Sequence, residues 1–208
     1  MEGVQEKFVN MLFNTWLIQS SVAFTNCLLD NGEKPAVISA IMKQQTTDRG
    51  REVLNNGMDI HAGSAICLGE NNFLEKFYRS APIGITVEGS NTLTRYLIIF
   101  GQGLNKSHPY IYPVLDSILT DNIDNFKDSF KNILKHSLSL YWKSLPGISI
   151  KNNTLLEKQT LHFANLSNFV ALKGGALKSE QFLSADMADI FSNLYLAHSV
   201  LWLSLIHN

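Results

Sequence analysis

The sequence predicts an all-α fold in which the helices pack as an antiparallel bundle. No segment sustains the alternation of apolar and polar residues that marks a strand. Apolar residues recur instead at helical spacing, and Asn, Gly and Pro separate the periodic segments. Because the connections between adjacent segments are short, antiparallel packing is favoured.

The first two helices are marked by clear end signals. One helix is predicted from about 4 to 29, with Asp30-Asn31-Gly32 as its stop. Its predicted core face comprises Phe8, Leu12, Trp16, Ile18, Val22 and Leu29. Pro35 is expected to open the second helix, and Asn55-Asn56-Gly57 to close it.

The middle of the chain is predicted to be less regular. Residues 58–72 are expected to form a loop of small residues, followed by a short helix over 72–79. Ala81-Pro82 should break this helix, leaving 83–87 extended. The next helix should start at Ser90 or Asn91 and end near Gly101 or Gly103.

Four further helical segments are predicted in the second half. Residues 110–120 should be loosely helical and broken by Pro113, and Asp121 should cap a long helix to Leu145. Thr154 and Glu157 have the spacing of a capping box, which predicts a helix to Leu172. The last helix is expected from about Ser184 to Leu205.

The composition limits the class of protein. The chain has 208 residues, 45% of them apolar and 17% charged, with a net charge of −1. This low charge suggests that a partner chain, another domain or a cofactor covers some apolar surface. Without a cluster of Lys and Arg, nucleic acid is not expected as a partner. The two cysteines, Cys27 and Cys67, fit a reduced cytosolic setting.

The sequence gives no metal-binding or phosphate-binding motif. Its six histidines are scattered without an HExxH pattern, so no metal site is predicted. The segment 57–69 is rich in glycine, but no Gly-Lys-Ser/Thr follows it and it follows no predicted strand. It is either a plain interhelical connection or a loop whose backbone N–H groups contact a phosphate-bearing ligand.

A single acid, Glu88, lies in the segment 84–103 directly before a predicted helix start. An acid at this position stabilises a helix through its dipole and its unpaired N–H groups. The same carboxylate could instead act as a catalytic base, which requires a desolvated site close to the proton it removes. The apolar neighbours Ile85, Val87 and Leu93 are consistent with a dry pocket.

The segments MDIHAGS and FLEKFYRSAPIGITVEGSNTLTR together resemble the C-terminal helical domain of flavin-dependent acyl-CoA dehydrogenases. The shared features are the Ala62-Gly63 loop, a helix ending at Arg79, the Glu88-Gly89-Ser90 turn and Arg95. The remainder, including DNGEKPAVISAIMKQQTTDRG, is similar to the long bacterial members that act in fatty-acid β-oxidation. With that subfamily the resemblance covers nearly the whole chain.

The resemblance implies a site and a reaction. Glu88 would remove the α-proton of an acyl-CoA thioester, and hydride from the β-carbon would pass to FAD, giving a trans-2-enoyl-CoA. The Glu88 N–H would donate to the thioester oxygen, and Gly89 would lie beside the acyl chain. The implied FAD contacts are Ser90, Asn91 and Thr92, together with Asp59, Ile60, His61, Ala62 and Gly63, which would reach the FAD of a neighbouring subunit. Asp59, Ala62 and Thr92 depart from the residues common in the family, which are Gln, Gly and Gln.

The resemblance also implies a domain organisation. Residues 1–108 would belong to the helical bundle of the dehydrogenase domain, and 109–208 would form an additional helical region; Pro146-Gly147 is an alternative boundary. Family members carry an N-terminal helical domain and a β-domain before this bundle. We therefore expect the 208-residue chain alone neither to retain FAD nor to oxidise acyl-CoA.

The implied partners are acyl-CoA, an electron-transfer acceptor protein and further copies of the subunit. A cytoplasmic location is expected, since the acidic N-terminus is no secretory signal and the apolar run 200–206 is too short to span a bilayer. Peripheral contact with the inner face of the membrane remains open. The alternative to an enzyme is a helical interaction module that associates with dehydrogenase subunits or with a membrane surface.

Overall fold

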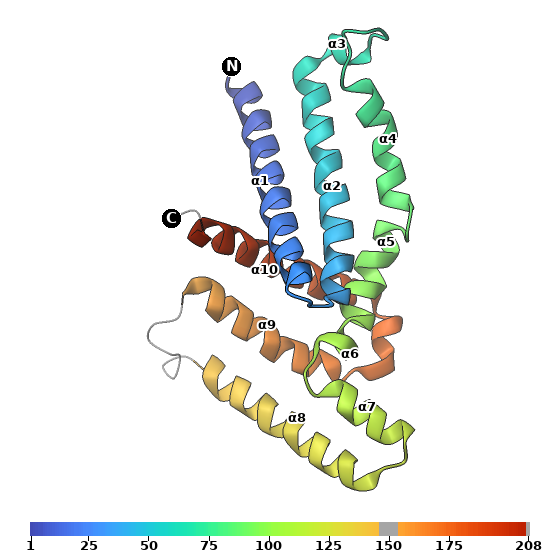
Figure 1. The fold of residues 1–208 in the computed structure, drawn as a ribbon, viewed down its shortest axis with the longest axis vertical. Helices are drawn as coiled ribbons and strands as arrows, with labels where there is room; N and C mark the ends of the chain where they lie inside the picture. The colour runs from blue at the N-terminus through green and yellow to red at the C-terminus, as the bar shows by residue number, and fades with distance from the viewer. Residues whose placement is uncertain (146–153, 207–208) are drawn as a thin grey trace. The chain divides into compact units, whose positions relative to one another are not determined.

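The computed structural model describes residues 1–145 and 154–206, and all regular structure within these ranges is helical (Figure 1). The prediction of an all-α fold is therefore confirmed. The long helices are α1 (Glu2–Asp30), α2 (Ala36–His61), α8 (Ile123–Ser144), α9 (Leu155–Ala171) and α10 (Gln181–Ile206). The short ones are α3 (Gly63–Ile66), α4 (Glu75–Thr86), α5 (Asn91–Leu93), the π-helix η1 (Thr94–Gln102), α6 (Leu104–Ser107), α7 (Ile111–Leu119) and the 3-10 helix η2 (Gly174–Lys178).

The chain divides into two compact units. Unit 1 comprises Met1–Arg95 with Tyr195–Asn208, and unit 2 comprises Tyr96–Leu194. The domain boundary expected at 108/109 from the resemblance stays a prediction. Its alternative, Pro146-Gly147, lies outside the described residues. Each unit has its own packing.

Small and polar side chains form the buried face of α1 in unit 1. Ser20 and Ser21 are fully buried, and each hydroxyl donates to the carbonyl four residues earlier in the same helix, at 2.7 Å. Asn14 is also buried, and its Oδ1 accepts a hydrogen bond of 2.7 Å from Arg49 of α2. Since these polar groups are satisfied, the small side chains allow close packing without an unpaired buried donor or acceptor.

The apolar face predicted for the first helix lies largely at the surface. Five of its six members are exposed: Phe8, Leu12, Trp16, Val22 and Leu29. That part of the prediction is wrong, because the residues that α1 buries are Asn14, Leu17, Ser20, Ser21 and Thr25 instead. A contiguous surface of this kind on a helix is typical of a region that another protein surface covers.

Two helices in unit 1 run past their predicted ends. α2 continues through Asn55-Asn56-Gly57 to His61, because Gly57 is buried where α2 meets the side chains of Met11 and Leu74. α4 contains Pro82 and continues to Thr86, so the extended segment predicted over 83–87 is wrong. The last turn of α4 packs closely against α2: Gly84 lies so near Thr47 that an added Cβ would be only 3.3 Å from Thr47 Cγ2. This contact stabilises the helix beyond Pro82.

Two start signals in unit 2 also differ from prediction. The N-cap of α8 is Asn122 and not Asp121: the Asn122 side chain accepts from the N–H of Asn125 at 3.1 Å, whereas Asp121 has a φ of 51°. Pro113 does not break α7 because it lies in the first turn, where its missing N–H costs no hydrogen bond.

The capping box predicted at the start of α9 is confirmed. Thr154 Oγ1 accepts from the N–H of Glu157 at 3.3 Å, and Glu157 accepts from the N–H of Thr154 at 2.8 Å. The box satisfies two helix-terminal donors reciprocally.

The C-terminal half of α10 packs against α1 inside unit 1. Phe24 lies between Tyr195 and Trp202, with ring centroids 5.7 and 5.2 Å away. Thr25 Oγ1 donates its only hydrogen to Ser21 O at 2.6 Å, so the Tyr195 hydroxyl is the donor in its 2.7 Å bond to Thr25. Burial raises the pKa of Tyr195 above 10.0.

α10 is also the one helix in the described ranges that is long and apolar enough to cross a membrane by length and composition. This finding revises the expectation drawn from the run 200–206, which considered only seven residues. Length and composition alone do not distinguish a membrane span from a core helix. Most of its fully buried residues are small, namely Ser184, Ala185, Ala188, Ser192 and Ser199, as expected where neighbouring helices approach closely, and Met187 is the large one among them.

Removal of the Tyr195 hydroxyl should weaken unit 1. We expect Tyr195→Phe to lower the free energy of unfolding by about 1 kcal/mol, because one buried hydrogen bond is lost while the ring packing remains. Urea denaturation followed by circular dichroism measures this change. Tyr112→Phe is the control, since Tyr112 is exposed. Equal stability of the two variants would contradict the role assigned to the Thr25–Tyr195 bond.

Unit 2 is built from the neighbouring pairs α7–α8 and α8–α9, with α6 against α7. Phe163 is central to its interior: its ring stacks on Phe191 at 5.4 Å and meets Phe100 edge-on at 6.3 Å. His136 of α8 contacts the rings of His108 and Tyr110, with centroids at 5.7 and 5.1 Å. Burial first, then His108 and Lys143, lower the pKa of His136 below 6.5.

The lowered pKa of His136 predicts a loss of stability in acid. The unfolded chain binds a proton on His136 more readily than the folded chain does. The free energy of unfolding is therefore unaffected by this histidine above about pH 6.5, and it decreases as the pH falls from there through the pKa of the folded state. We expect His136→Gln to lose less stability than the unmodified chain between pH 7.5 and pH 5. Thermal unfolding at both pH values tests this, with His162→Gln, at an exposed position, as the control. An unchanged pH dependence in His136→Gln would refute it.

Candidate active site

The predicted catalytic acid lies in a strained turn between α4 and α5. Val87 leaves α4 in an extended conformation, with ψ at 153°. Glu88 and Gly89 then have φ values of 55° and 98°, and Ser90 begins α5 as its N-cap. A positive φ suits Gly89 but is uncommon for Glu, and such strain persists only where the surroundings impose it.

Lys43 of α2 holds this turn in place. Its ammonium group donates to the carbonyl oxygens of Ile85, at 3.2 Å, and of Gly89, and to Asn91 Oδ1 at 2.6 Å. These three acceptors lie before, within and after the turn that carries Glu88. Because Ile85 lies in the last turn of α4, the cation also faces the negative end of that helix dipole.

Asn91 is the second anchor of the turn. Its side chain is buried, and Nδ2 donates to Asp48 Oδ1 at 2.7 Å and to Thr47 Oγ1 at 2.8 Å. The predicted contact between Asn91 and FAD stays a prediction. Within the chain, however, both ends of the amide are already engaged with α2.

The anchored turn presents Glu88 outward. The carboxylate belongs to an exposed residue, and the neighbouring Val87 and Leu93 are exposed as well. Within the described ranges, the Glu88 N–H donates to no other group. The chain therefore offers a carboxylate and an N–H donor side by side, next to an apolar surface that it does not itself cover.

The remaining predicted cofactor residues, 59–63, lie at the other end of α2 (Figure 1). Asp59 lies sixteen positions after Lys43 in the same helix, which corresponds to about 24 Å at 1.5 Å per residue. Asp59 forms an exposed ion pair of 2.8 Å with Lys7, and this pair raises the pKa of Lys7 above 10.5. The two predicted groups of residues therefore do not meet in one site within one chain.

The segment 59–63, predicted to lie in a loop, contains the last turn of α2 and the start of α3, with a change of direction at Ala62. Ala62 has a φ of 47°, and it separates α2 from the short α3. The His61 ring meets Phe73 edge-on at 5.2 Å, while Ile60 is half-buried and Gly63 is exposed. The structure thus leaves the tip of this loop accessible.

Sequence reasoning did not identify Lys43 as part of the site. One signal was present: Lys43 is the only charged residue between Lys34 and Asp48. Its neighbours Ile41, Met42, Gln44 and Gln45 are buried in the structure. An isolated charge within a stretch of this kind indicates a partner elsewhere in the fold, although the sequence does not say which carbonyl groups it binds.

The structure thus defines a helical domain that presents a clamped acidic turn. The family model described as the acyl-CoA dehydrogenase C-terminal domain matches residues 1–100, which include this turn and the loop 59–63. The bacterial-type acyl-CoA dehydrogenase C-terminal model matches residues 151–203. No solved structure was found to match the chain significantly.

The two matches together cover most of the chain, so the chain belongs to the acyl-CoA dehydrogenase family. Specifically, it carries the C-terminal helical parts of such an enzyme, as the resemblance indicated. The family is one of oxidoreductases that typically use FAD.

Loss of the Lys43 ammonium should loosen the turn. We expect Lys43→Met to lower the free energy of unfolding by roughly 2 kcal/mol. The substitution removes the charged donor of the three hydrogen bonds that Lys43 makes to the turn and its flanks. Hydrogen–deuterium exchange over residues 87–91 should accelerate more than exchange within α4. Lys34→Met, at an exposed position before α2, is the control. Unchanged exchange in the turn would contradict the assignment of Lys43 as its anchor.

Proposed function

We propose that the chain supplies the catalytic base of an acyl-CoA dehydrogenase, which converts an acyl-CoA thioester to the trans-2-enoyl-CoA. The observation that supports this proposal most directly is the turn at Glu88. There an acid with a positive φ is held outward by a buried network, while its carboxylate makes no hydrogen bond or ion pair within the described ranges. A carboxylate serving only as a helix cap would be expected to accept from a helix N–H, and here Ser90 fills that role.

The chemistry of the turn follows from its two polar groups. The Glu88 carboxylate would accept the α-proton of the thioester. Its own N–H, which has no acceptor in the described chain, would donate to the thioester oxygen, where negative charge develops as that proton leaves. Val87 and Leu93 would be covered by the acyl chain or by other parts of the enzyme. Gly89, which has no side chain, would leave space for the acyl chain beside Glu88. This covering would supply the desolvation that a carboxylate base needs.

The groups near the turn fit a flavin in part. Thr92 is exposed and its hydroxyl has no partner in the described chain, and the Ser90 hydroxyl accepts from Leu93 N–H while keeping its own hydrogen to donate. Both are suitable donors for an acceptor-rich flavin ring, whereas the Asn91 side chain is used internally. FAD, when bound, supplies the acceptor for the hydride that leaves the β-carbon. Ser90 and Thr92 would hold the flavin of FAD beside the turn.

The loop 59–63 would contact FAD only in an assembly. The segment 59–63 lies about 24 Å along α2 from Lys43, which holds the Glu88 turn. A flavin ring bound at Glu88 therefore does not reach this segment of the same chain. A contact with the FAD of a neighbouring subunit is consistent with this separation. The accessible backbone at Ala62 and Gly63 supports that arrangement.

A second candidate function is a helical interaction module without turnover. The observation that favours it is the exposed apolar surface of α1, which includes Phe8, Leu12 and Trp16. This surface suits association with dehydrogenase subunits, and it is equally compatible with an enzyme. The two candidates are distinguished by whether the full protein oxidises acyl-CoA, and the role of Glu88 is tested by whether that turnover requires it.

The replacement Glu88→Gln in the full natural protein that contains this chain tests the proposal. We expect acyl-CoA-dependent bleaching of the flavin absorbance to slow by roughly a thousandfold, because the amide no longer accepts the α-proton. Flavin content and thermal stability should stay unchanged, since Glu88 is exposed and makes no ion pair in the described chain.

The matched control for this test is Asp121→Asn. Asp121 is also an exposed acid with a positive φ, at 51°, but it lies in unit 2. Its replacement should leave bleaching unchanged. Turnover by Glu88→Gln at a rate close to that of the unmodified protein would refute Glu88 as the base. A lack of acyl-CoA-dependent bleaching in the unmodified protein would favour the interaction module.

A further inference from the structure

α8 exposes an apolar stripe along one side of unit 2. The stripe comprises Phe130, Leu134, Leu138 and Tyr141, and between 43% and 58% of each residue is exposed. These four residues lie on one face of the helix because they are four, four and three positions apart. Trp142, next to Tyr141, is 52% exposed as well. Unit 2 therefore leaves a row of leucine and aromatic side chains, called the α8 stripe below, uncovered.

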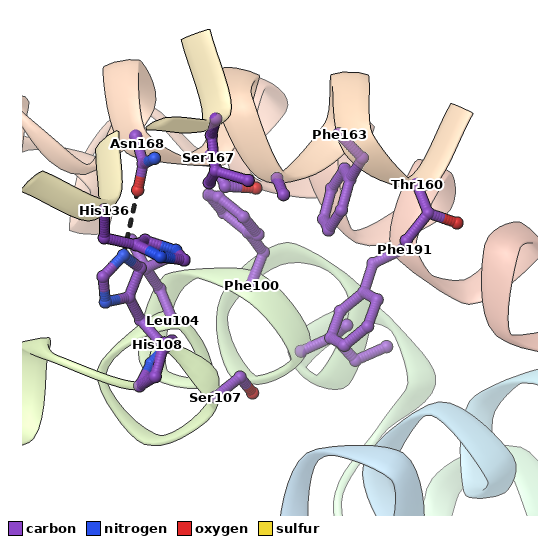
Figure 2. A pocket seen from close by; sticks show the side chains of 14 residues that line it. Phe100, Leu104, Ser107, His108, His136, Thr160, Phe163, Ser167, Asn168 and Phe191 are labelled. Carbon is purple, nitrogen blue, oxygen red and sulfur yellow. Dashed lines mark hydrogen bonds between the residues drawn. The ribbon is translucent and has the colours of Figure 1, made fainter. Parts of the chain in front are cut away.

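A different face of α8 is packed within unit 2. α8 lies against α7 and α9, and its half-buried residues include Ile133, His136 and Leu140. Figure 2 shows the His136 side chain beside His108 and Asn168, in a pocket that Leu140 also lines. The interior of unit 2 is thus formed by a face of α8 that does not include the α8 stripe.

Lysines accompany the α8 stripe, and acids do not. Lys131, Lys135 and Lys143 are exposed, and no Asp or Glu occurs over residues 129–145. At about 100° per residue, Lys131 and Lys135 lie beside the stripe and not opposite it. None of the three lysines forms an ion pair within the described ranges. Their long stems can lie along an apolar surface while the ammonium groups remain at its edge.

The positive charge distinguishes α8 from the other helix with a large exposed apolar surface. α1 exposes Phe8, Leu12 and Trp16, among others. Its charged side chains, however, are one lysine and three acids, and the lysine forms an ion pair with Asp59. A negatively charged surface would therefore be repelled by α1 and attracted by α8.

The shape and charge of α8 restrict what covers the stripe. A basic amphipathic helix with aromatic residues on its apolar side is typical of helices that lie in the surface of an anionic bilayer. Trp and Tyr favour the level of the lipid headgroups, where lysines also meet phosphate groups. A protein that encircles a basic helix does not fit, because another face of α8 is packed within unit 2. A flat, negatively charged surface over an apolar layer matches the stripe and its lysines together.

We propose that α8 docks on the surface of an anionic phospholipid bilayer. The α8 stripe would lie at the boundary of the acyl chains, and Lys131, Lys135 and Lys143 would lie at the phosphate groups. The helix would lie in the plane of the surface, with a contact about 16 Å long from Phe130 to Tyr141. The proposal goes beyond the role proposed for Glu88, which belongs to unit 1, and each can fail without the other.

Cosedimentation with lipid vesicles tests the inference with the 208-residue chain. Vesicles of phosphatidylglycerol and phosphatidylcholine in equal amounts present a negative surface, and vesicles of phosphatidylcholine alone present the same apolar layer without that charge. We expect the chain to bind the charged vesicles at least about tenfold more tightly. Raising the salt concentration from about 0.1 M to about 0.5 M should remove most of this preference, because salt screens exposed charges.

Lysine variants test the electrostatic part of the contact. Replacing the three α8 lysines together by Gln should weaken binding to the charged vesicles by on the order of a hundredfold, since each cation near such a surface contributes about fivefold. The matched control replaces three exposed lysines outside α8 by Gln, namely Lys34, Lys76 and Lys106. This control changes the net charge equally and should weaken binding by less than about threefold.

A leucine pair tests the apolar part of the contact. Leu134→Gln should weaken binding to the charged vesicles by about tenfold, because an apolar side chain no longer leaves water. Leu12→Gln on α1 is the matched control, since Leu12 and Leu134 are both 55% exposed. It should leave binding unchanged. Circular dichroism of both variants checks that the helical fold is retained.

Tryptophan fluorescence locates the helix that enters the bilayer surface. Lipids brominated in their acyl chains should quench the fluorescence of the bound chain, and Trp142→Phe should lose this quenching while Trp16→Phe keeps it. Equal binding to both kinds of vesicle would overturn the inference, as would α8 lysine variants that bind like their controls or quenching that Trp142→Phe retains. Failure to bind either vesicle at about 1 mM lipid would also overturn it, and would assign the α8 stripe to a protein surface.

Discussion

The position of the candidate base depends on one interaction, the insertion of the Lys43 ammonium between α4 and α5. The three oxygens that it binds belong to residues on both sides of Glu88. A turn with two successive positive φ values is not stable through its own backbone, because Glu88 gains nothing locally from that conformation. The cation supplies the compensating energy, and it draws the end of α4 and the start of α5 towards the same point on α2.

The same constraint explains why α4 ends where it does. Pro82 removes one hydrogen bond from the middle of the helix, yet the helix continues to Thr86. Its last carbonyls are stabilised by Lys43, and Gly84 lets the helix approach Thr47 closely. A local rule for proline predicted a break here, and contacts with a distant helix outweighed it.

The sequence allowed the fold class, the capping box at Thr154 and the acidic turn at Glu88 to be predicted, because each depends on residues close together in the chain. It did not reveal which face of α1 is buried. Periodicity locates an apolar stripe, but here the stripe of Phe8, Leu12 and Trp16 is exposed, while Ser20 and Ser21 are buried. The role of Lys43 was missed for a related reason, since its partners lie more than forty residues away.

The two units differ in how they treat buried polar groups. In unit 1, Ser20, Ser21 and Thr25 each bond to a carbonyl of their own helix, so the polar interior is complete without a ligand. All four buried side-chain atoms that lack a partner in the described ranges belong to unit 2, on Ser167, Asn168, Ser184 and Ser192. Ser184 and Ser192 are small groups within close helix contacts, where a hydroxyl is tolerated at some cost. Asn168 has a packing role of its own, because its Oδ1 accepts from His108 Nε2 at 2.9 Å and so ties α9 to the segment that precedes α7. The unpaired groups of unit 2 are therefore a cost of close helix packing, which unit 1 avoids by pairing its buried hydroxyls within each helix.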